Sequence, residues 1–282
     1  MIFSVLIANY NNGEYLRQAV ESAIGQDYCD LEILILDDAS TDESISIIKE
    51  IASKDGRIRV LLHDTNKGIG YSKRELVAES RGEVFGFLDP DDYLSPKALE
   101  VMMDAHRAMP DTGLIYSTLI HVDYKGNEIG VSSYNKPVPE GTTFMSSGGI
   151  SHFCTIKRSF YNLTEGINPL LRIAEDQDLY MKLEEVAPIH FVNLPLYYYR
   201  SHSGAISLNG NITRSHVWQM IARYEAYKRR NIPIDENLLI KYFISKEEKF
   251  NNFYFNMYQP KHALLQFLKA VKKWTLSIFR LS

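Results

Sequence analysis

Cysteine is scarce in this chain, which has only Cys29 and Cys154 among its 282 residues. The two lie far apart and in no spacing typical of a metal site. This argues against a disulfide scaffold and a cysteine-based zinc site, and it suits a reducing compartment. We therefore expect a cytoplasmic protein.

Long apolar runs and an excess of basic residues are also missing. No stretch approaches the ~18 to 20 uninterrupted apolar residues of a membrane-spanning helix. The apolar start, Ile2 to Ala8, follows no basic residue and leads directly into turn residues, so we expect a buried strand and not a signal peptide. A formal net charge of -4 argues against nucleic acid as a partner.

Hydrophobic residues are plentiful, at 45% of the chain, which is enough for a substantial core. In the first hundred residues, short apolar strand-like segments alternate with segments whose apolar residues recur at helical spacing. The strand-like segments are 2–8, 31–36, 58–63 and 83–88, and the helical ones are 14–26, the stretch after 42, and 69–80. This alternation predicts a doubly wound α/β fold with a mostly parallel sheet covered on both faces.

Polar residues follow all four predicted strands. The clusters are Asn9-Tyr10, Asp37-Asp38, Asp64-Thr65-Asn66 and Asp89-Pro90-Asp91-Asp92. In parallel sheets, ligands bind beyond the carboxyl ends of the strands, where loops and helix N-termini converge. We therefore expect the four clusters to share one rim.

The later part of the chain is less regular. It predicts strands over 114–122, 151–157 and 189–199, a helix over 175–185, and helices from about 213 onward. Residues 132–150 are rich in Ser, Gly and Pro, which is typical of a long functional loop.

The cluster Asp89 to Asp92 places several hard oxygen ligands within a few ångströms of one another. Such a set suits Mg²⁺ or Mn²⁺ bridging to diphosphate oxygens. For an isolated tetrapeptide, a solvated turn before a helix at Ser95-Pro96 is the simpler interpretation. An EF-hand fits worse, because Tyr93 and Leu94 occupy its fifth and sixth positions.

The other three clusters suggest contacts with a nucleotide. A carboxylate of Asp37-Asp38 could accept a hydrogen bond from a base such as uracil, while Tyr10 stacks on the ring. Asn66 and Arg74 suit base or phosphate oxygens. Helix capping by Asp38 or Ser40 is the alternative for the first pair, and it can coexist with base binding. Taken alone, Asn66-Lys67-Gly68 with Arg74 is better explained as an ordinary basic helix start.

These segments, in this order and spacing, resemble glycosyltransferase family 2. The resemblance rests on Val5 to Asn11, Leu36 to Asp42, Asn66-Lys67-Gly68 with Arg74, Phe87 to Asp92, Ala174 to Leu179, and Tyr199 to Gly204. It covers roughly residues 2–207. Departures from the family pattern occur at Ala8 and Asn9, where Pro-Thr is frequent, and after Arg74, where Glu75 and Leu76 replace Asn and Gly.

The resemblance implies a GT-A fold and an inverting transfer of sugar from a nucleotide donor. It implies a nucleotide-sugar-binding half at 1–100, an acceptor-binding and catalytic-base half at 101–207, and a C-terminal helical extension at 208–282. The implied base pocket is lined by Ala8, Tyr10 and Asp38, supported by Asp37. Asp91 and Asp92 would face the ribose, the diphosphate and a Mn²⁺ or Mg²⁺ ion.

The resemblance also assigns the later motifs. Asp176 would be the catalytic base that deprotonates an acceptor hydroxyl, although Glu175 and Asp176 also suit the first turn of a helix for its dipole alone. Glu175 and His152 are candidate acceptor contacts, with a structural role the favoured alternative for His152. His202 resembles a loop residue that binds metal or phosphate.

Residues 261–282 carry five basic and no acidic residues, interleaved with large apolar ones. This pattern fits a helix at an anionic membrane interface, at the inner face of the cell membrane, and equally a helix packed on its own domain or in an oligomer. The leading function is transfer to a glycan or lipid-linked acceptor in bacterial-type surface polysaccharide synthesis. A sugar nucleotidyltransferase and a non-catalytic sugar-nucleotide-binding protein are the alternatives.

Overall fold

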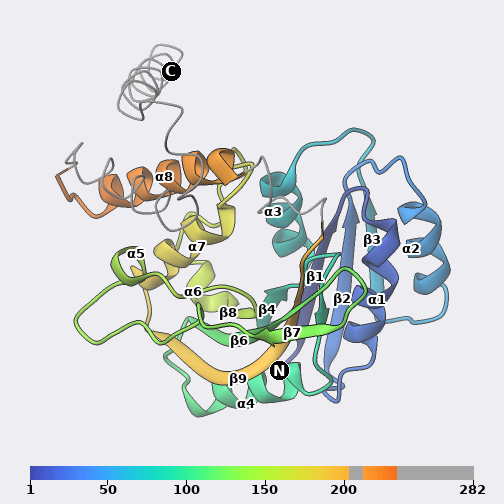
Figure 1. Cartoon of the computed structure of the whole chain (residues 1–282), viewed down its shortest axis with the longest axis horizontal. Helices are drawn as coiled ribbons and strands as arrows, with labels where there is room; N and C mark the ends of the chain where they lie inside the picture. Colours follow the sequence, from blue (N-terminus) through green and yellow to red (C-terminus); the bar gives the residue numbers. More distant parts are fainter. Residues whose placement is uncertain (203–211, 234–282) are drawn as a thin grey trace. The chain divides into compact units, whose positions relative to one another are not determined.

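The computed structural model describes residues 1–202 and 212–233 (Figure 1). The chain forms two compact units, Met1–Ala226 and Tyr227–Ser282. Among the described residues, no helix has the length and apolar character needed to cross a membrane. The helix expected at 261–282 lies outside the described residues.

A nine-stranded mixed sheet organises the first unit, in the order β3-β2-β1-β4-β8-β6-β9-β5, with β7 paired to β6. The strands are β1 (Phe3–Asn9), β2 (Leu31–Asp37), β3 (Ile58–Leu62), β4 (Val84–Phe87), β5 (Tyr93–Leu94), β6 (Leu114–Val122), β7 (Glu128–Val131), β8 (Cys154–Lys157) and β9 (Ile189–Arg200). The pairs among β1 to β4 are parallel. Beyond β4, β8 runs antiparallel to both β4 and β6, and β9 runs parallel to β6.

Eight helices accompany the strands within the described residues. They are α1 (Gly13–Ile24), α2 (Ser44–Ala52), α3 (Ile69–Glu79), α4 (Ala98–Ala108), α5 (Phe144–Ser147), α6 (Arg158–Tyr161), α7 (Glu175–Glu184) and α8 (Ile212–Arg229). The predicted strand and helix segments up to Arg229 are confirmed to within a few residues, and the helices expected after residue 233 lie outside the described residues. The short elements β5, β7, α5 and α6 were not predicted, because two to four residues are too few to show a period.

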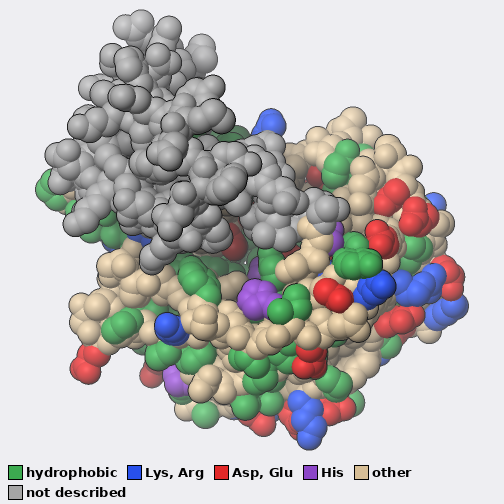
Figure 2. All heavy atoms as spheres, viewed as in Figure 1, with side chains coloured by type: hydrophobic (Ala, Val, Ile, Leu, Met, Phe, Trp, Pro, Cys, Tyr) green, Lys and Arg blue, Asp and Glu red, His purple; other side chains and the backbone are tan. Residues whose placement is uncertain are grey.

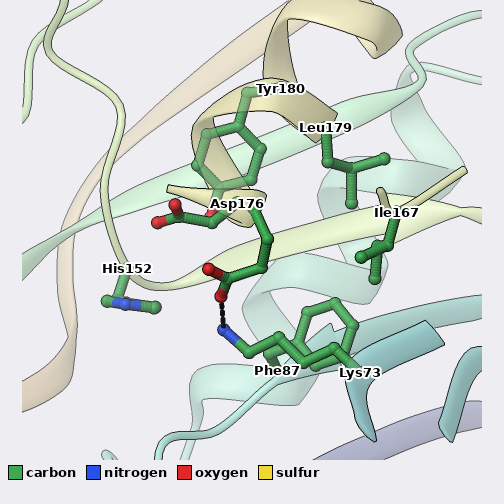
Figure 3. Close-up of a pocket in the computed structure, with 8 residues that line it drawn as sticks. Lys73, Phe87, His152, Ile167, Asp176, Leu179 and Tyr180 are labelled. Carbon is green, nitrogen blue, oxygen red and sulfur yellow. Dashed lines mark hydrogen bonds and ion pairs between the residues drawn. The ribbon is translucent and has the colours of Figure 1, made fainter. Parts of the chain in front are cut away.

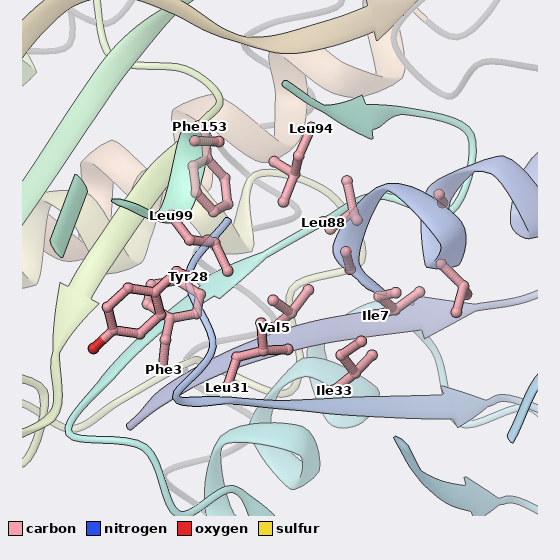
Figure 4. Packing of buried hydrophobic residues seen from close by; sticks show 14 of the residues in the cluster. Phe3, Val5, Ile7, Tyr28, Leu31, Ile33, Leu88, Leu94, Leu99 and Phe153 are labelled. Atoms are coloured by element: carbon pink, nitrogen blue, oxygen red, sulfur yellow. The ribbon is translucent and has the colours of Figure 1, made fainter. Parts of the chain in front are cut away.

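The alternation of side chains along β1 explains how the sheet is covered. Phe3, Val5 and Ile7 are fully buried and join one core cluster with residues of α1, α2 and α4 (Figure 4). The intervening residues point to the opposite face, where α3 packs on β1. Figure 1 shows α3 on the other side of the sheet from α1 and α2. The prediction of an α/β sheet with flanking helices is confirmed.

Charged side chains of both signs mix on the surface. The face in Figure 2 shows acidic and basic groups interspersed toward the α2 side. Glu50 of α2 pairs with both Arg17 and Lys54, each at 2.6 Å.

Candidate functional site

The ends of β1 and β2 meet as the parallel pairing requires. The backbone N–H of Asp38 donates to the Asn9 carbonyl at 2.8 Å. The Asn9 side-chain amide donates to Oδ2 of Asp37 at 2.8 Å, and the Ser40 backbone N–H donates to Oδ1 of Asp37, also at 2.8 Å. Asp37 is fully buried, so its carboxylate supports the rim from within.

Asp38 ties the end of β2 to the loop after β3. Its carboxylate accepts the backbone N–H groups of Lys67 and Gly68 at 2.9 and 2.8 Å and lies 2.6 Å from Nδ1 of His63. Gly68 has φ +93, which suits glycine. His63 in turn contacts Glu75 of α3 at 3.0 Å. Asp38 therefore shapes the loop that holds the exposed Asn66.

Two predicted base-pocket residues flank this rim. Ala8 is 8% exposed at the end of β1. Tyr10 directly follows that strand and has 47% of its surface exposed. An exposed aromatic ring directly after a strand end offers a face on which a planar base could stack.

Asp89 and Asp91 follow β4, and each faces a histidine. Oδ2 of Asp89 lies 3.2 Å from Nε2 of His152, and Oδ2 of Asp91 lies 2.8 Å from Nε2 of His202. Burial raises the pKa of Asp91, and the neighbouring carboxylate of Asp89 raises it further. Two carboxylates crowded in this way favour a bound cation.

Asp92, expected with Asp91 to face the diphosphate and the metal ion, has a different environment from Asp91 and has both carboxylate oxygens engaged by the chain itself. It is 2% exposed. Its Oδ2 accepts the hydroxyl of Tyr197 and its Oδ1 accepts the backbone N–H of Arg200, both at 2.7 Å. In this arrangement the Asp92 carboxylate fastens the end of β9 to the acidic cluster.

Arg200 fixes the strand end that precedes His202. Its guanidinium donates to the Asp91 carbonyl at 2.8 Å and to the side chain of Gln18 at 2.5 Å, and it lies over the ring of Tyr15. The Tyr15 and His202 rings are 5.0 Å apart. These contacts hold Arg200 and His202, the described end of the Tyr199 motif, against the acidic cluster.

Asp176 lies at the start of α7 and opens on a pocket (Figure 3). The pocket is lined by Lys73, Phe87, His152, Ile167, Glu175, Asp176, Leu179 and Tyr180. Burial raises the pKa of Asp176, and the carboxylate of Glu175 raises it further. The pocket thus joins α3 and β4 of the first half to α7 of the second.

Lys73 was missed by sequence reasoning. Its ammonium lies 2.7 Å from Oε1 of Glu175 and 3.9 Å from Oδ1 of Asp89. The predicted cation, Arg74, is on the exposed side of α3 and donates to the carbonyl of Ile167 at 3.2 Å. The helical spacing could have indicated that Lys73 is buried. Lys73 lies three and four residues before the buried Leu76 and Val77, which places it on the same face of the helix.

A metal ion would find part of its coordination shell here. Within residues 1–202 and 212–233, no three His, Cys, Asp or Glu side chains are grouped as a complete metal site. Asp91 and His202 offer one carboxylate and one imidazole, both of which Mn²⁺ accepts. Sites for phosphate-bound divalent ions commonly use one or two protein ligands, with substrate oxygens completing the shell. The residues present fit such an ion.

Solved structures with a similar fold include S. aureus TarS 1-349 in complex with UDP-GlcNAc. It has a TM-score of 0.71 and 20% sequence identity, over 94% of this chain and 78% of that one. The mannosyltransferase PcManGT from Pyrobaculum calidifontis, in complex with GDP-Man and Mn²⁺, has a TM-score of 0.61 and 13% identity, over 97% of this chain and 83% of that one. At these identities the likeness shows the fold, which is the expected GT-A type.

Sequence relatives include the chondroitin synthase of Escherichia coli, 36% identical over 196 residues, which are 70% of this chain and 28% of that protein. The hyaluronan synthase of Pasteurella multocida is 30% identical over 196 residues, 70% of this chain and 20% of that protein. The chain therefore spans less than a third of the length of these relatives. The family model described as "Glycosyl transferase family 2" matches residues 4–162, and the chain belongs to that family.

Proposed function

We propose that this chain is an inverting glycosyltransferase that moves a sugar from a UDP-sugar to a hydroxyl of a glycan or lipid-linked acceptor. The observation that carries the proposal is a pocket that Asp176 lines together with Lys73 and His152. His152 pairs with Asp89 of the acidic cluster, so a candidate base and the donor rim converge on one space. Such convergence is what group transfer between two bound substrates requires.

The comparisons support the substrate class. The relatives' names point to polysaccharide synthesis, and TarS has been solved with UDP and with UDP-GlcNAc. We propose the same class of donor for this chain and a role in surface polysaccharide synthesis at the cytoplasmic face of a cell membrane. The uracil preference is favoured by Tyr10 and Asp38 at the rim.

Asp176 is proposed as the general base. Its carboxylate accepts the proton of the acceptor hydroxyl while the hydroxyl oxygen attacks the anomeric carbon from the face opposite the leaving group. The bond between that carbon and the diphosphate oxygen breaks, the nucleoside diphosphate leaves, and the configuration inverts. Burial raises the pKa of Asp176 and so strengthens it as a base at neutral pH.

Asp91 and His202 are proposed to hold Mn²⁺ or Mg²⁺. Such an ion, when bound, would offset the negative charge that grows on the departing diphosphate. Asp92, with both of its oxygens hydrogen-bonded to β9 residues, is proposed to keep Asp91 in place. Tyr10, Ala8 and Asp38 are proposed to contact the base, Asn66 the donor from the loop that Asp38 shapes, and Glu175 and His152 to border the acceptor.

The test is a donor panel on the full chain. UDP-, GDP- and dTDP-sugars are offered with Mn²⁺ and oligosaccharide acceptors, and both the transferred sugar and the released nucleotide are measured. We expect transfer with release of nucleoside diphosphate. Release of pyrophosphate would instead identify a nucleotidyltransferase, and binding without turnover a non-catalytic protein.

The matched variants are Asp176→Asn and Asp104→Asn. Asp176→Asn removes the proposed base and should lower transfer at least about a hundredfold while donor binding is kept, the range of general-base contributions. Asp104 is exposed on α4, away from the pocket lining, and its variant should behave as the wild type. Undiminished transfer by Asp176→Asn would rule out this mechanism.

A further inference from the structure

Lys73 is a buried cation in the lining of the pocket, between Asp89 and Glu175. Its side chain is 8% exposed and that of its partner Glu175 is 7% exposed. The ammonium also lies 5.2 Å from the centroid of the Phe87 ring. Withdrawing an ammonium and a carboxylate from water costs several kcal/mol for each ion, and close pairing offsets this only while both remain.

Charges alternate from the donor rim to the proposed base. His152 faces Asp89 at 3.2 Å, Asp89 faces Lys73 at 3.9 Å, and Lys73 faces Glu175 at 2.7 Å. Asp176 is the next residue along the chain. Without Lys73, two neighbouring carboxylates would share a buried site, and like charges so close do not both stay ionised.

Helix α3 also holds the segment that leads to Asp176. A Cβ added at Gly70 would lie 2.7 Å from the Leu171 carbonyl, so the helix and this segment are in close backbone contact. Arg74 donates to the Ile167 carbonyl from the same helix. Ala174, immediately before Glu175, has a left-handed backbone with φ 65, a strained conformation that neighbouring contacts must maintain.

We propose that Lys73 is a positioning residue for sugar transfer, which holds Glu175 and thereby keeps Asp176 ionised and aimed at the acceptor. This inference rests on the proposed function. It goes beyond it by giving α3, an element of the donor half, control over the base of the acceptor half. Electrostatics agrees, because burial and Glu175 raise the pKa of Asp176 and the charge of Lys73 lowers it.

Several groups bear on the titration of Asp176. They are Glu175 beside it, Lys73 of α3, His152 of the preceding loop, Cys154 of β8 and Tyr180 of α7. Burial raises the pKa of the Cys154 thiol and of the Tyr180 hydroxyl, so both stay neutral over the assay range. Lys73 and Glu175 therefore shift the pKa of Asp176 in opposite directions, and removing both charges together should leave that pKa nearly unchanged.

The experiment uses Lys73→Met, Lys73→Arg, the double variant Lys73→Met with Glu175→Gln, and Lys49→Met as a matched control on an exposed position of α2. Transfer, donor hydrolysis, the donor KM and the pH dependence of kcat are measured on the full chain. Lys73→Met should lower kcat for transfer about a hundredfold with the donor KM within threefold of wild type. The acid limb of the pH profile of kcat, which reports the ionisation of Asp176, should move to higher pH by about one unit. This is the size of a single close charge interaction.

The other variants separate the explanations. Lys73→Arg should restore kcat to within about tenfold, and the double variant should return the acid limb toward wild type, because both charges are gone. If Lys73→Met raises the donor KM and leaves kcat and its acid limb unchanged, Lys73 binds donor and the inference is wrong. An acid limb in the double variant like that of Lys73→Met would also overturn it.

Folding and the proposed function are checked alongside. Thermal unfolding of each variant is measured. If Lys73→Met does not fold, the test rests on kcat and on the acid limb of its pH profile in Lys73→Arg and in the double variant, each compared with wild type. Transfer by wild type with no defect in any Lys73 variant would refute the inference alone. Absence of transfer by wild type with every donor would refute the proposed function and the inference with it.

Discussion

Nε2 of His202 lies 2.8 Å from Oδ2 of Asp91, although 111 positions separate the two residues in the sequence. The contact joins a residue just after β9 to one just after β4. Arg200 brings the two strand ends together by donating to the Asp91 carbonyl. The chain thus assembles a carboxylate and an imidazole that could share one divalent ion.

This pairing predicts that His202→Ala and Asp91→Asn weaken metal binding. Each variant should raise the Mn²⁺ concentration for half-maximal activity by about tenfold or more, since even residues that only support a ligand change affinity ten- to a hundredfold. Mn²⁺ binding in the presence of UDP, followed by calorimetry, gives a readout without turnover. His190→Ala, at an exposed position of β9, is the control. Unaltered Mn²⁺ affinity in both site variants would place the ion elsewhere.

Asp92 predicts a loss of stability. Asp92→Ala would leave the buried hydroxyl of Tyr197 and the Arg200 N–H without their acceptor, and each such loss costs about 1–3 kcal/mol. We expect the free energy of unfolding in urea to fall by about 2–5 kcal/mol. Asp104→Ala, which breaks an exposed ion pair with Arg107, should change it by less than about 1 kcal/mol. Equal effects of the two variants would contradict a structural role for Asp92.

His152 predicts a loss of stability in alkaline solution. Burial alone would lower the pKa of His152, but the carboxylate of Asp89 outweighs burial and raises it to about 9. A folded pKa above the unfolded value near 6.5 contributes stability that is complete below about pH 6.5 and is lost as pH rises through about 9. The gap corresponds to on the order of 3 kcal/mol.

The measurement is urea unfolding of wild type and His152→Phe between pH 6 and pH 10. The stability difference between them should shrink as pH rises through this window. A difference that stays constant with pH would show that the Asp89 contact contributes no linked stability.

The sequence predicted the parallel half of the sheet better than it predicted the pocket. Residues at the ends of β1, β2 and β4 could be placed together because parallel strands end at a common edge. The hydrogen bond between Tyr197 and Asp92 could not be foreseen, because it joins residues 105 positions apart and depends on the antiparallel pairing of β5 with β9. Arg74 was preferred to Lys73 by motif, whereas the phase of α3 turns Lys73 inward.

The position of Asp176 likewise depends on packing between segments that are distant in the sequence. Residues 168–171 are in close backbone contact with α3. No local sequence pattern in either segment predicts that contact. Sequence spacing could propose Asp176 as a base, but its environment, with Glu175 and Lys73 beside it, comes from the docking of α3 against this segment. A change confined to that interface should therefore alter catalysis without touching any charged group.

Gly70→Ala makes such a change. The added Cβ would lie 2.7 to 2.9 Å from the carbonyl oxygens of Leu171, Asn168 and Pro169, closer than backbone atoms can tolerate, so the segment must move. Since a misplacement of about 1 Å can cost a hundredfold in rate, kcat for transfer should fall by about ten- to a hundredfold. Gly56→Ala is the matched control, because its added Cβ meets no atom within 4 Å. Equal kcat values for the two variants would mean that α3 does not set the position of Asp176.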